Sequence, residues 1–409
     1  GEEEDLTLND RRKTARQVNM VDDGSANRTT GPAHVGLALA GGGPEGAVYE
    51  IGALRALDEA IEGLDLNAMH TYVGVSAGAF LASCLANGLT PRQLVRSVVS
   101  SGPGGHPFVA QTFFTPAVGE FARRGLSTPR LAYDAVRDYL SNPEDVGLFD
   151  SLTRVARALP AGLFGNDPIR RYLERIFSVT GRTDDFRELS RNLIVVATDL
   201  DSGQEARFGL PPHDRVPISR AVQASTALPG LYPPVEIGGR SYVDGVLLKT
   251  LHASVALDAG CELLLCINPI VPVDTADAVE AGVMREGRLA RRGLPTILSQ
   301  TFRTLVHSRL NVGMSAYSPR YPDADVLLVE PSRDDYRMFF TNIFRFSSRK
   351  SVVEHAYAST RRQLLARAEE IGPVLARHGL RLRTAVLHED RDLWTSDGLA
   401  GDPRPGSGV

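Results

Sequence analysis

The chain has 409 residues, of which 43% are hydrophobic and 23% charged, and its formal net charge is −4. This composition is typical of a soluble globular protein, and the length suits one large domain or two ordinary ones. The slight acidic excess argues against nucleic acid as the main partner, because nucleic-acid-binding domains usually carry a clear basic excess.

The three cysteines, Cys84, Cys261 and Cys266, lie in or beside apolar runs, so we expect buried thiols in a reducing compartment. No apolar run is long enough to predict a membrane span, and the N-terminus does not have the pattern of a signal peptide. We therefore expect a cytoplasmic protein without metal or cofactor. Peripheral membrane contact stays open, since aromatic residues lie between arginines over 337–346, although core or subunit contact is the favoured interpretation of this segment. The oligomeric state is not predicted.

Residues 1–32 are polar and without periodicity, which predicts a disordered tail. Order begins with an apolar run, His34 to Ala40, of the length of a buried parallel strand. Gly41-Gly42-Gly43-Pro44-Glu45-Gly46 follows at once. Helical spacing then begins, with apolar residues at Val48, Ile51, Leu54, Leu57 and Ile61. The pattern is strand, glycine-rich loop, helix.

Such a loop can hold a phosphate or can present consecutive N–H groups as an oxyanion hole. A P-loop is excluded because no Gly-Lys-Ser/Thr closes it. A dinucleotide site needs an acidic residue at the end of the next strand. That strand, Thr71 to Val73, leads instead into Gly74-Val75-Ser76-Ala77-Gly78.

This second stretch has the form G-x-S-x-G between a strand and the helical run Ala79 to Ala86. The form is typical of a nucleophile elbow, in which a sharp turn presents a serine at a helix N-terminus. Both loops follow the carboxyl ends of strands that should be neighbours, where open α/β sheets place their active sites. Acyl transfer is therefore the better interpretation of the two loops together.

The two loops together resemble those of the patatin-like phospholipase family. The resemblance extends, in the family's order, over roughly residues 34 to 270, including the segments 193–200, 220–234 and 242–246. It implies a three-layer α/β fold with a mostly parallel sheet between helices, and hydrolysis of lipid esters by a Ser-Asp dyad. The catalytic residues would be Ser76 and Asp244.

The resemblance also gives roles to seven glycines. Gly41, Gly42 and Gly43 would form the oxyanion hole. The turns around the two catalytic residues would depend on Gly46, Gly74, Gly78 and Gly245. Two positions depart from the family pattern. Glu45 stands where the family usually has Arg or Lys, which weakens the inference to a phospholipid. Val246 replaces a small residue and matters less.

The rest of the chain would complete this domain, 33–270. A helical insertion at about 90–190, with helices at 126–140, 148–159 and 168–179, would form either a lid or a helical layer. Residues 271–295 are expected to be a mobile loop. A strand at 262–267 would lie near the end of the catalytic domain. Residues 296–394 would be mostly helical, with a strand at 325–331 and a long helix over 351–371 that Gly372-Pro373 ends or kinks. Residues 395–409 would be a disordered tail.

The expected substrate is a lipid ester, cleaved by a phospholipase A or lysophospholipase type of reaction. The same dyad would also serve an acyltransferase or a thioesterase, because an acyl-enzyme can pass its acyl group to water, an alcohol or a thiol. A lipid-binding or storage protein of the same fold is a further alternative. A histidine base would have to be His213 or His252, for which structural or surface roles are the default.

Overall fold

The computed structural model describes residues 34–99, 115–116, 164–280, 287–332 and 346–396. They belong to one compact unit, 33–409. Its centre is a sheet of eight strands. These are β1 (Val35–Leu39), β3 (Thr71–Val75), β6 (Asn192–Asp199), β7 (Glu205–Phe208), β8 (Val235–Ile237), β9 (Arg240–Asp244), β10 (Leu263–Ile267) and β11 (Asp325–Val329).

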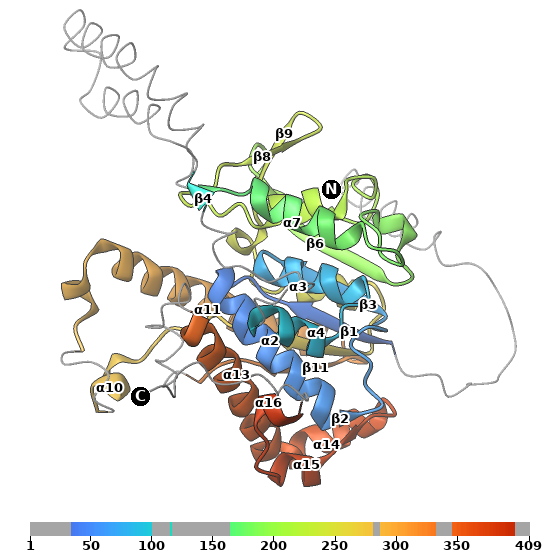
Figure 1. Ribbon diagram of the computed structural model, residues 1–409, viewed down its shortest axis with the longest axis vertical. Coiled ribbons are helices and arrows are strands. Elements are labelled where there is room, and N and C mark those ends of the chain that lie inside the picture. The colour runs from blue at the N-terminus through green and yellow to red at the C-terminus, as the bar shows by residue number, and fades with distance from the viewer. Residues whose placement is uncertain (1–33, 100–114, 117–163, 281–286, 333–345, 397–409) are drawn as a thin grey trace, which may run out of the picture. The chain divides into compact units, whose positions relative to one another are not determined.

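The strand order is β11-β10-β1-β3-β6-β9-β8, with β7 also paired to β6. From β11 to β6 the strands are parallel, whereas β7, β8 and β9 pair antiparallel. Two short antiparallel pairs lie outside this sheet: β2 (Ile61–Glu62) with β12 (Arg381–Leu382), and β4 (Thr115–Pro116) with β5 (Phe164–Gly165). The expected fold class, a mostly parallel sheet between helices, is confirmed (Figure 1).

Outside the strands, the regular secondary structure of the described residues is helical. The α-helices are α2 (Gly43–Ala60), α3 (Ala77–Ala86), α4 (Pro91–Val99), α7 (Asp167–Phe177), α8 (Ile218–Ser225), α9 (Ala253–Asp258), α10 (Thr275–Glu280), α11 (Leu294–Arg320), α13 (Phe346–Ala366), α14 (Ala368–Arg377), α15 (Thr384–His388) and α16 (Leu393–Ser396). The 3₁₀ helices are η2 (Phe186–Glu188), η3 (Gly245–Leu247) and η4 (Leu289–Arg292).

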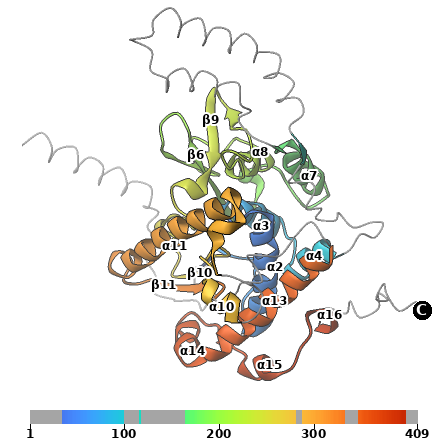
Figure 2. The ribbon, with the colours of Figure 1, turned by 90° about the vertical axis from the view of Figure 1, so that its left-hand side faces the viewer.

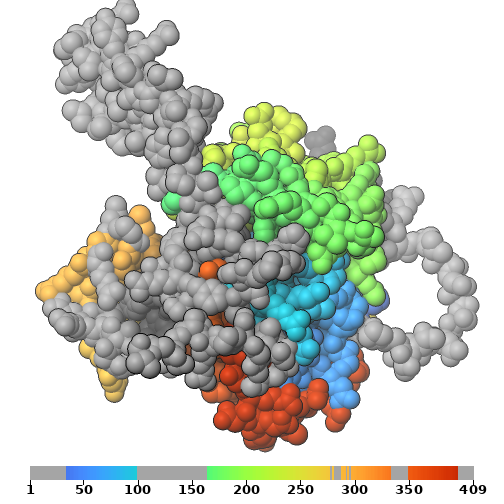
Figure 3. Space-filling model, in the orientation of Figure 1, coloured from blue at the N-terminus to red at the C-terminus, as the bar shows by residue number. Residues whose placement is uncertain are grey.

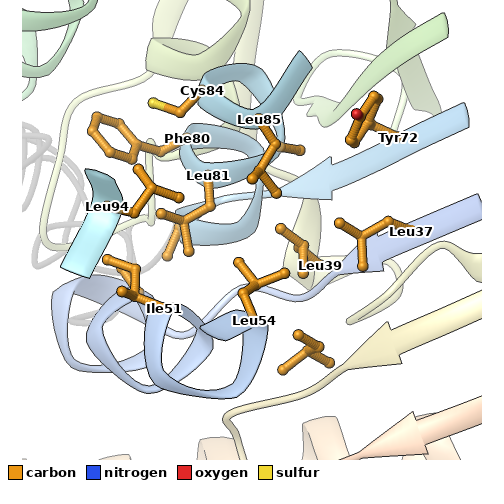
Figure 4. Packing of buried hydrophobic residues seen from close by; sticks show 14 of the residues in the cluster. Leu37, Leu39, Ile51, Leu54, Tyr72, Phe80, Leu81, Cys84, Leu85 and Leu94 are labelled. Carbon is orange, nitrogen blue, oxygen red and sulfur yellow. The ribbon is translucent and has the colours of Figure 1, made fainter. Parts of the chain in front are cut away.

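The two faces of the sheet are buried by different helices, because successive strand residues point to opposite sides. On one face Leu37 and Leu39 pack with side chains of α2 and α3, as Figure 4 shows. On the other face Ala38 and Ala40 belong to a cluster with residues of α9 and α11. The three expected layers result from this alternation.

The C-terminal helices complete the first face, where α13 packs along α2. Figure 3 shows the red C-terminal residues adjoining the blue and cyan residues of the first α/β units. All three cysteines are buried, as expected. No helix in the described ranges has the length and apolar character needed to cross a bilayer.

Two expectations about the C-terminal half are wrong. The helix predicted over 351–371 ends at Ala366, and Pro373 lies inside the next helix, α14. The break falls at Arg367, and α14 continues through the proline with Ile371 and Leu375 buried. Residues 271–295 also differ from the loop we expected, since they include α10 and η4. Val271 and Val273, near the start of this stretch, are buried.

Several expectations lie outside the described residues. They concern the two tails, 1–32 and most of 395–409, the helices at 126–140 and 148–159, and nearly all of 337–346. The role of the insertion as lid or layer, and the proposed domain limits, stay predictions.

A buried charge network joins α2 to the C-terminal helices. The Glu59 carboxylate accepts hydrogen bonds from Tyr357 and Arg391, and it lies 3.7 Å from both Arg55 and Arg361. Burial alone would raise the pKa of Glu59, but these hydrogen bonds and charges lower it below its usual range. The carboxylate therefore stays ionised and neutralises buried guanidinium groups.

We expect Glu59→Ala to lower the free energy of unfolding by about 3–5 kcal/mol, because it removes the carboxylate beside buried Arg361 and one of the two carboxylates beside buried Arg55. Urea unfolding followed by circular dichroism would measure the change. The matched control is Glu62→Ala, which removes the exposed partner of Arg381 and should cost less than about 1 kcal/mol. Equal losses in the two variants would contradict a stabilising role for the buried network.

Candidate active site

Ser76 occupies a strained turn between β3 and α3. Its φ of 54° and ψ of −121° lie in a region that side-chain-bearing residues rarely adopt. The flanking glycines make this turn sterically possible. A Cβ at Gly74 would lie 2.4 Å from the Cα of Ala79, and one at Gly78 would lie 2.3 Å from the carbonyl oxygen of Leu39. The turn therefore has the geometry expected of a nucleophile elbow.

Strand register explains why Asp244 meets this turn. The last residue of β3, Val75, pairs with Val196 of β6, and Asp244 at the end of β9 pairs with the next β6 residue, Ala197. Around these positions β7 occupies the opposite edge of β6, so β3 and β9 share one edge. Since β3 is parallel and β9 antiparallel to β6, they run toward each other. Ser76 and Asp244 lie where the two strand ends meet.

The Ser76 hydroxyl lies close enough to the Asp244 carboxylate to lower its pKa by hydrogen bonding. Asp244 is only 1% exposed. Burial raises its pKa to about 7, against the lowering effect of hydrogen bonds from the Ser76 hydroxyl and the Val246 N–H, the latter 2.9 Å from Oδ1. The Thr198 hydroxyl donates to the Asp244 carbonyl oxygen at 3.0 Å. A carboxyl group with a pKa near neutrality thus contacts the serine.

The backbone of the elbow is fixed by a second serine. The Ser76 N–H donates to Ser225 Oγ at 2.8 Å, and Ser225 Oγ donates to the carbonyl oxygen of Val196 at 2.6 Å. The Gly78 N–H donates to the carbonyl oxygen of Ala40 at 3.1 Å. These two N–H groups are therefore engaged in holding the turn.

The glycine-rich loop passes directly beside the serine. A Cβ at Gly41 would lie 3.1 Å from Ser76 Cβ. Gly42 and Gly46 pack on Pro269, where added Cβ atoms would approach its Cγ to 2.5 and 2.9 Å. A side chain at Gly42 or Gly46 would therefore collide with Pro269 unless the loop shifted.

Helix α2 begins within this loop, at Gly43, whose φ of +60° favours glycine. The first N–H groups of a helix have no partner within the helix and carry its positive dipole end. The sheet thus places a helix N-terminus, the Ser76 hydroxyl and the Asp244 carboxylate at one edge.

The turn after Asp244 is held by His252. Its Nδ1 lies 2.8 Å from a carboxylate oxygen of Glu205, and its Nε2 lies 3.1 Å from the carbonyl oxygen of Gly245. Both partners are acceptors, so the ring makes both hydrogen bonds only when both nitrogens carry a hydrogen. Gly245 is itself required, since a Cβ there would lie 2.5 Å from the carbonyl oxygen of Val196.

The electrostatics of Glu205 agree with this arrangement. Burial would raise its pKa, but the hydrogen bond and charge of His252, together with Arg207, lower it to about 2. His252 thus contacts the turn behind Asp244. His213 packs against the rings of Phe208 and Tyr242, with centroids 5.3 and 6.2 Å away. The structural roles expected for both histidines agree with these contacts.

Glu45, the departure from the family pattern, faces a cation from another helix. Nη2 of Arg303 in α11 lies 3.7 Å from a Glu45 carboxylate oxygen. Burial lowers the pKa of Arg303, and the charge of Glu45 opposes that effect. The glycine loop therefore has a guanidinium beside it, supplied by α11.

Sequence reasoning missed Ser225 and Arg303 as parts of this site. Ser225 lies within the small-residue segment that carried the resemblance, so that segment was the available signal. Arg303 acts through a contact between distant segments, for which a single sequence gives no sign. Within the described ranges, no group of three or more His, Cys, Asp or Glu side chains could hold a metal ion.

Comparison with known proteins agrees with this geometry. The model of one protein family, described as Patatin-like phospholipase, matches residues 37–102 and 121–257. The chain belongs to the patatin-like phospholipase family. The match includes the glycine loop, the Ser76 elbow and the turn at Asp244.

Among curated proteins, an uncharacterized NTE family protein of Mycobacterium bovis is 27% identical over 204 residues, which is 48% of this chain and 30% of the relative. One of Mycobacterium tuberculosis is 26% identical over 236 residues, or 57% of this chain and 30% of the relative. The matches thus span less than a third of the length of these relatives.

Two solved structures overlap the patatin-like chain loosely. VipD from Legionella pneumophila has a TM-score of 0.37 and 17% identity, covering 86% of this chain and 72% of VipD. The type III effector protein ExoU has a TM-score of 0.31 and 14% identity, covering 80% of this chain and 52% of ExoU. No residue of this chain is assigned a role from these overlaps.

We expect Asp244→Asn to stabilise the fold, and more so at pH 8 than at pH 5. Because the folded-state pKa of about 7 lies above the ordinary aspartate value of 3.8, ionising this carboxyl group costs stability. This free-energy cost appears as the pH rises above the pKa of the unfolded state. It reaches its full size, on the order of 4 kcal/mol, above pH 7. Urea midpoints of both proteins at both pH values would measure it, and an equal difference at pH 5 and pH 8 would contradict it.

Proposed function

We propose that this protein is a serine acyl hydrolase that cleaves carboxylic esters of lipids, with Ser76 as nucleophile and Asp244 as general base. The observation that carries the proposal is the approach of the Ser76 hydroxyl to a carboxylate that is 1% exposed and whose pKa this hydroxyl lowers. Membership of the patatin-like phospholipase family supports a lipid ester as the substrate.

In the first half-reaction, Ser76 Oγ attacks the ester carbonyl carbon while its proton passes to Asp244. The tetrahedral oxyanion accepts hydrogen bonds from backbone N–H groups of Gly42 and Gly43 in the glycine loop, beside Gly41, and from that of Ala77. Ala77 is assigned because the N–H groups of Ser76 and Gly78 already have partners. Each such donor is worth about 3 kcal/mol in the transition state.

Collapse of this intermediate breaks the bond to the leaving alcohol, which takes the proton from Asp244. The acyl group is then esterified to Ser76. In the second half-reaction water attacks the acyl carbon and gives a proton to Asp244, which returns it to Ser76 Oγ as the fatty acid leaves. One carboxyl group acts as base and as acid in each half, and a pKa near neutrality suits both tasks.

The alternatives differ in the acceptor of the acyl group. An acyltransferase would discharge the acyl-enzyme to an alcohol, whereas a thioesterase would form it from a thioester. A non-catalytic lipid-binding or storage protein would have no need of the strained Ser76 turn or of a buried carboxylate in contact with it, since both carry energetic costs. Product analysis with phospholipid, lysophospholipid, monoacylglycerol and acyl-thioester substrates would separate these classes.

We expect Ser76→Ala and Asp244→Asn each to lower kcat/KM for ester hydrolysis by about a thousandfold or more, because each removes one partner of a single proton-transfer unit. Hydrolysis of a short-chain chromogenic ester would measure the loss. A fluorophosphonate probe should label the wild-type protein at Ser76 and leave Ser76→Ala unlabelled. Circular dichroism would verify that both variants are folded, and normal turnover by either one would refute its assignment.

We also expect kcat/KM to rise with pH through an inflection near 7. Asp244 accepts the serine proton only when ionised, and its pKa is raised to about 7. Rates between pH 5 and pH 9 with a substrate that does not titrate would give the profile. An inflection near pH 4, as for a solvated carboxylate, would contradict a buried base.

A further inference from the structure

Helix α11 and the residues just before it are free of acidic side chains. Residues 287–320 contain six arginines and no Asp or Glu, although Asp and Glu make up 49 of the 409 residues of the chain. Arg288, Arg291, Arg309 and Arg320 are exposed. This part of the surface is therefore locally basic on a chain whose formal net charge is negative.

The same helix exposes an apolar stripe. Leu298, Leu305 and Val312 are spaced seven residues apart, which places them along one side of a helix. They are 58%, 57% and 71% exposed, and with Ile297 they make up four of the eight exposed large hydrophobic residues in the described ranges. On another side of α11, Val306 and Leu310 pack in the hydrophobic core. Packing within the described part of the chain thus leaves the stripe unexplained.

Helix α11 contacts both halves of the proposed active site. Near its middle, Arg303 pairs with Glu45 of the glycine loop. Two turns later, Arg309 Nη1 donates to the carbonyl oxygen of Leu247, at the end of the 3₁₀ turn that follows Asp244, at 2.8 Å. Figure 2 shows α11 in the foreground, across β10. Whatever binds the outer side of α11 lies within about one helix diameter, 10–12 Å, of the elements that hold the site.

Beside Val312 the surface forms a basic pocket of about 420 Å³ between α11 and residues 248–254. Its lining includes three cationic side chains, Lys249, Arg309 and Arg320, and the hydroxyl groups of Thr250, Ser254, Ser308 and Tyr317. Two of these cations have a carboxylate nearby, since Glu205 lies 3.9 Å from Lys249 and Asp258 lies 3.6 Å from Arg320. No Asp or Glu is among the lining residues, so the lining itself suits an anion.

We propose that the outer face of α11 docks the protein on an anionic lipid bilayer. Leu298, Leu305 and Val312 enter the boundary between headgroups and acyl chains, while the basic pocket binds the anionic headgroups. This inference rests on the proposed function, since a lipid ester substrate gives the protein a reason to bind a bilayer. Exposed apolar residues together with arginines and no acidic side chain are the combination that interfacial helices use.

Cosedimentation of the full chain with vesicles tests the surface. The wild-type protein should bind vesicles of phosphatidylcholine mixed with phosphatidylserine at least about tenfold more tightly than vesicles of phosphatidylcholine alone. The double variant Leu305→Asp/Val312→Asp should bind the mixed vesicles about tenfold more weakly or worse. Arg288→Gln/Arg320→Gln should reduce the preference for the anionic vesicles.

The matched control is Val179→Asp/Leu200→Asp, which makes the same changes at exposed positions outside α11, 43% and 51% exposed. It should bind mixed vesicles as the wild type does. Leu305→Asp/Val312→Asp, the α11 variant, and the control should both keep wild-type hydrolysis of a water-soluble short-chain ester. Hydrolysis of vesicle lipid should fall in the α11 variant and not in the control. Unchanged thermal unfolding would verify that the variants are folded.

Three outcomes would overturn the docking surface: no vesicle binding by the wild type, equal binding by the wild type and the α11 variant, or an equal loss in the control. A change in oligomeric state of the α11 variant with vesicle binding unchanged would assign the stripe to a second copy of the chain and overturn it too. Failure of the proposed function is distinguishable, because the wild type would then neither hydrolyse the soluble ester nor react with the fluorophosphonate.

Discussion

The site depends on two strands that end against each other on one edge of β6. Ser76 follows the end of parallel β3, and Asp244 ends antiparallel β9. The last residues of these two strands pair with consecutive residues of β6, and β7 pairs with the opposite edge of β6. Register alone brings the two side chains together, without a long loop to position either. The same arrangement removes Asp244 from water, so the contact with Ser76 and the raised pKa have one structural cause.

Those parts of the site that are local in sequence could be predicted from it. Ser76 and the glycine loop each lie within a strand-turn-helix pattern of about twenty residues, and the structure has those elements. Asp244 could be predicted only through the resemblance. The β8–β9 hairpin has no strong local sequence signal, and its register against β6 depends on residues that are distant in sequence. Ser225 and Arg303 act through tertiary contacts, which periodicity does not encode.

The errors have a similar origin. Pro373 was expected to end a helix, yet the chain ends one helix at Ala366 and starts α14 at Ala368, so that the proline removes a single hydrogen bond from a helix held by buried Ile371 and Leu375. Local propensity was outweighed by packing there. In the same way, Val271 lies in a stretch without a helical or strand period, and burial of its side chain could not be inferred from spacing.

The pairing of Glu45 with Arg303 has an evolutionary consequence. In this chain the glycine loop bears the anion and α11 the cation, whereas the family usually places a cation in the loop. A basic side chain at position 45 without a change in α11 would lie beside Arg303, and the two positive charges would repel each other in a partly buried place. Relatives with a basic loop residue should therefore carry a neutral or acidic residue at the α11 position, and the two sites should mutate as a pair along a lineage.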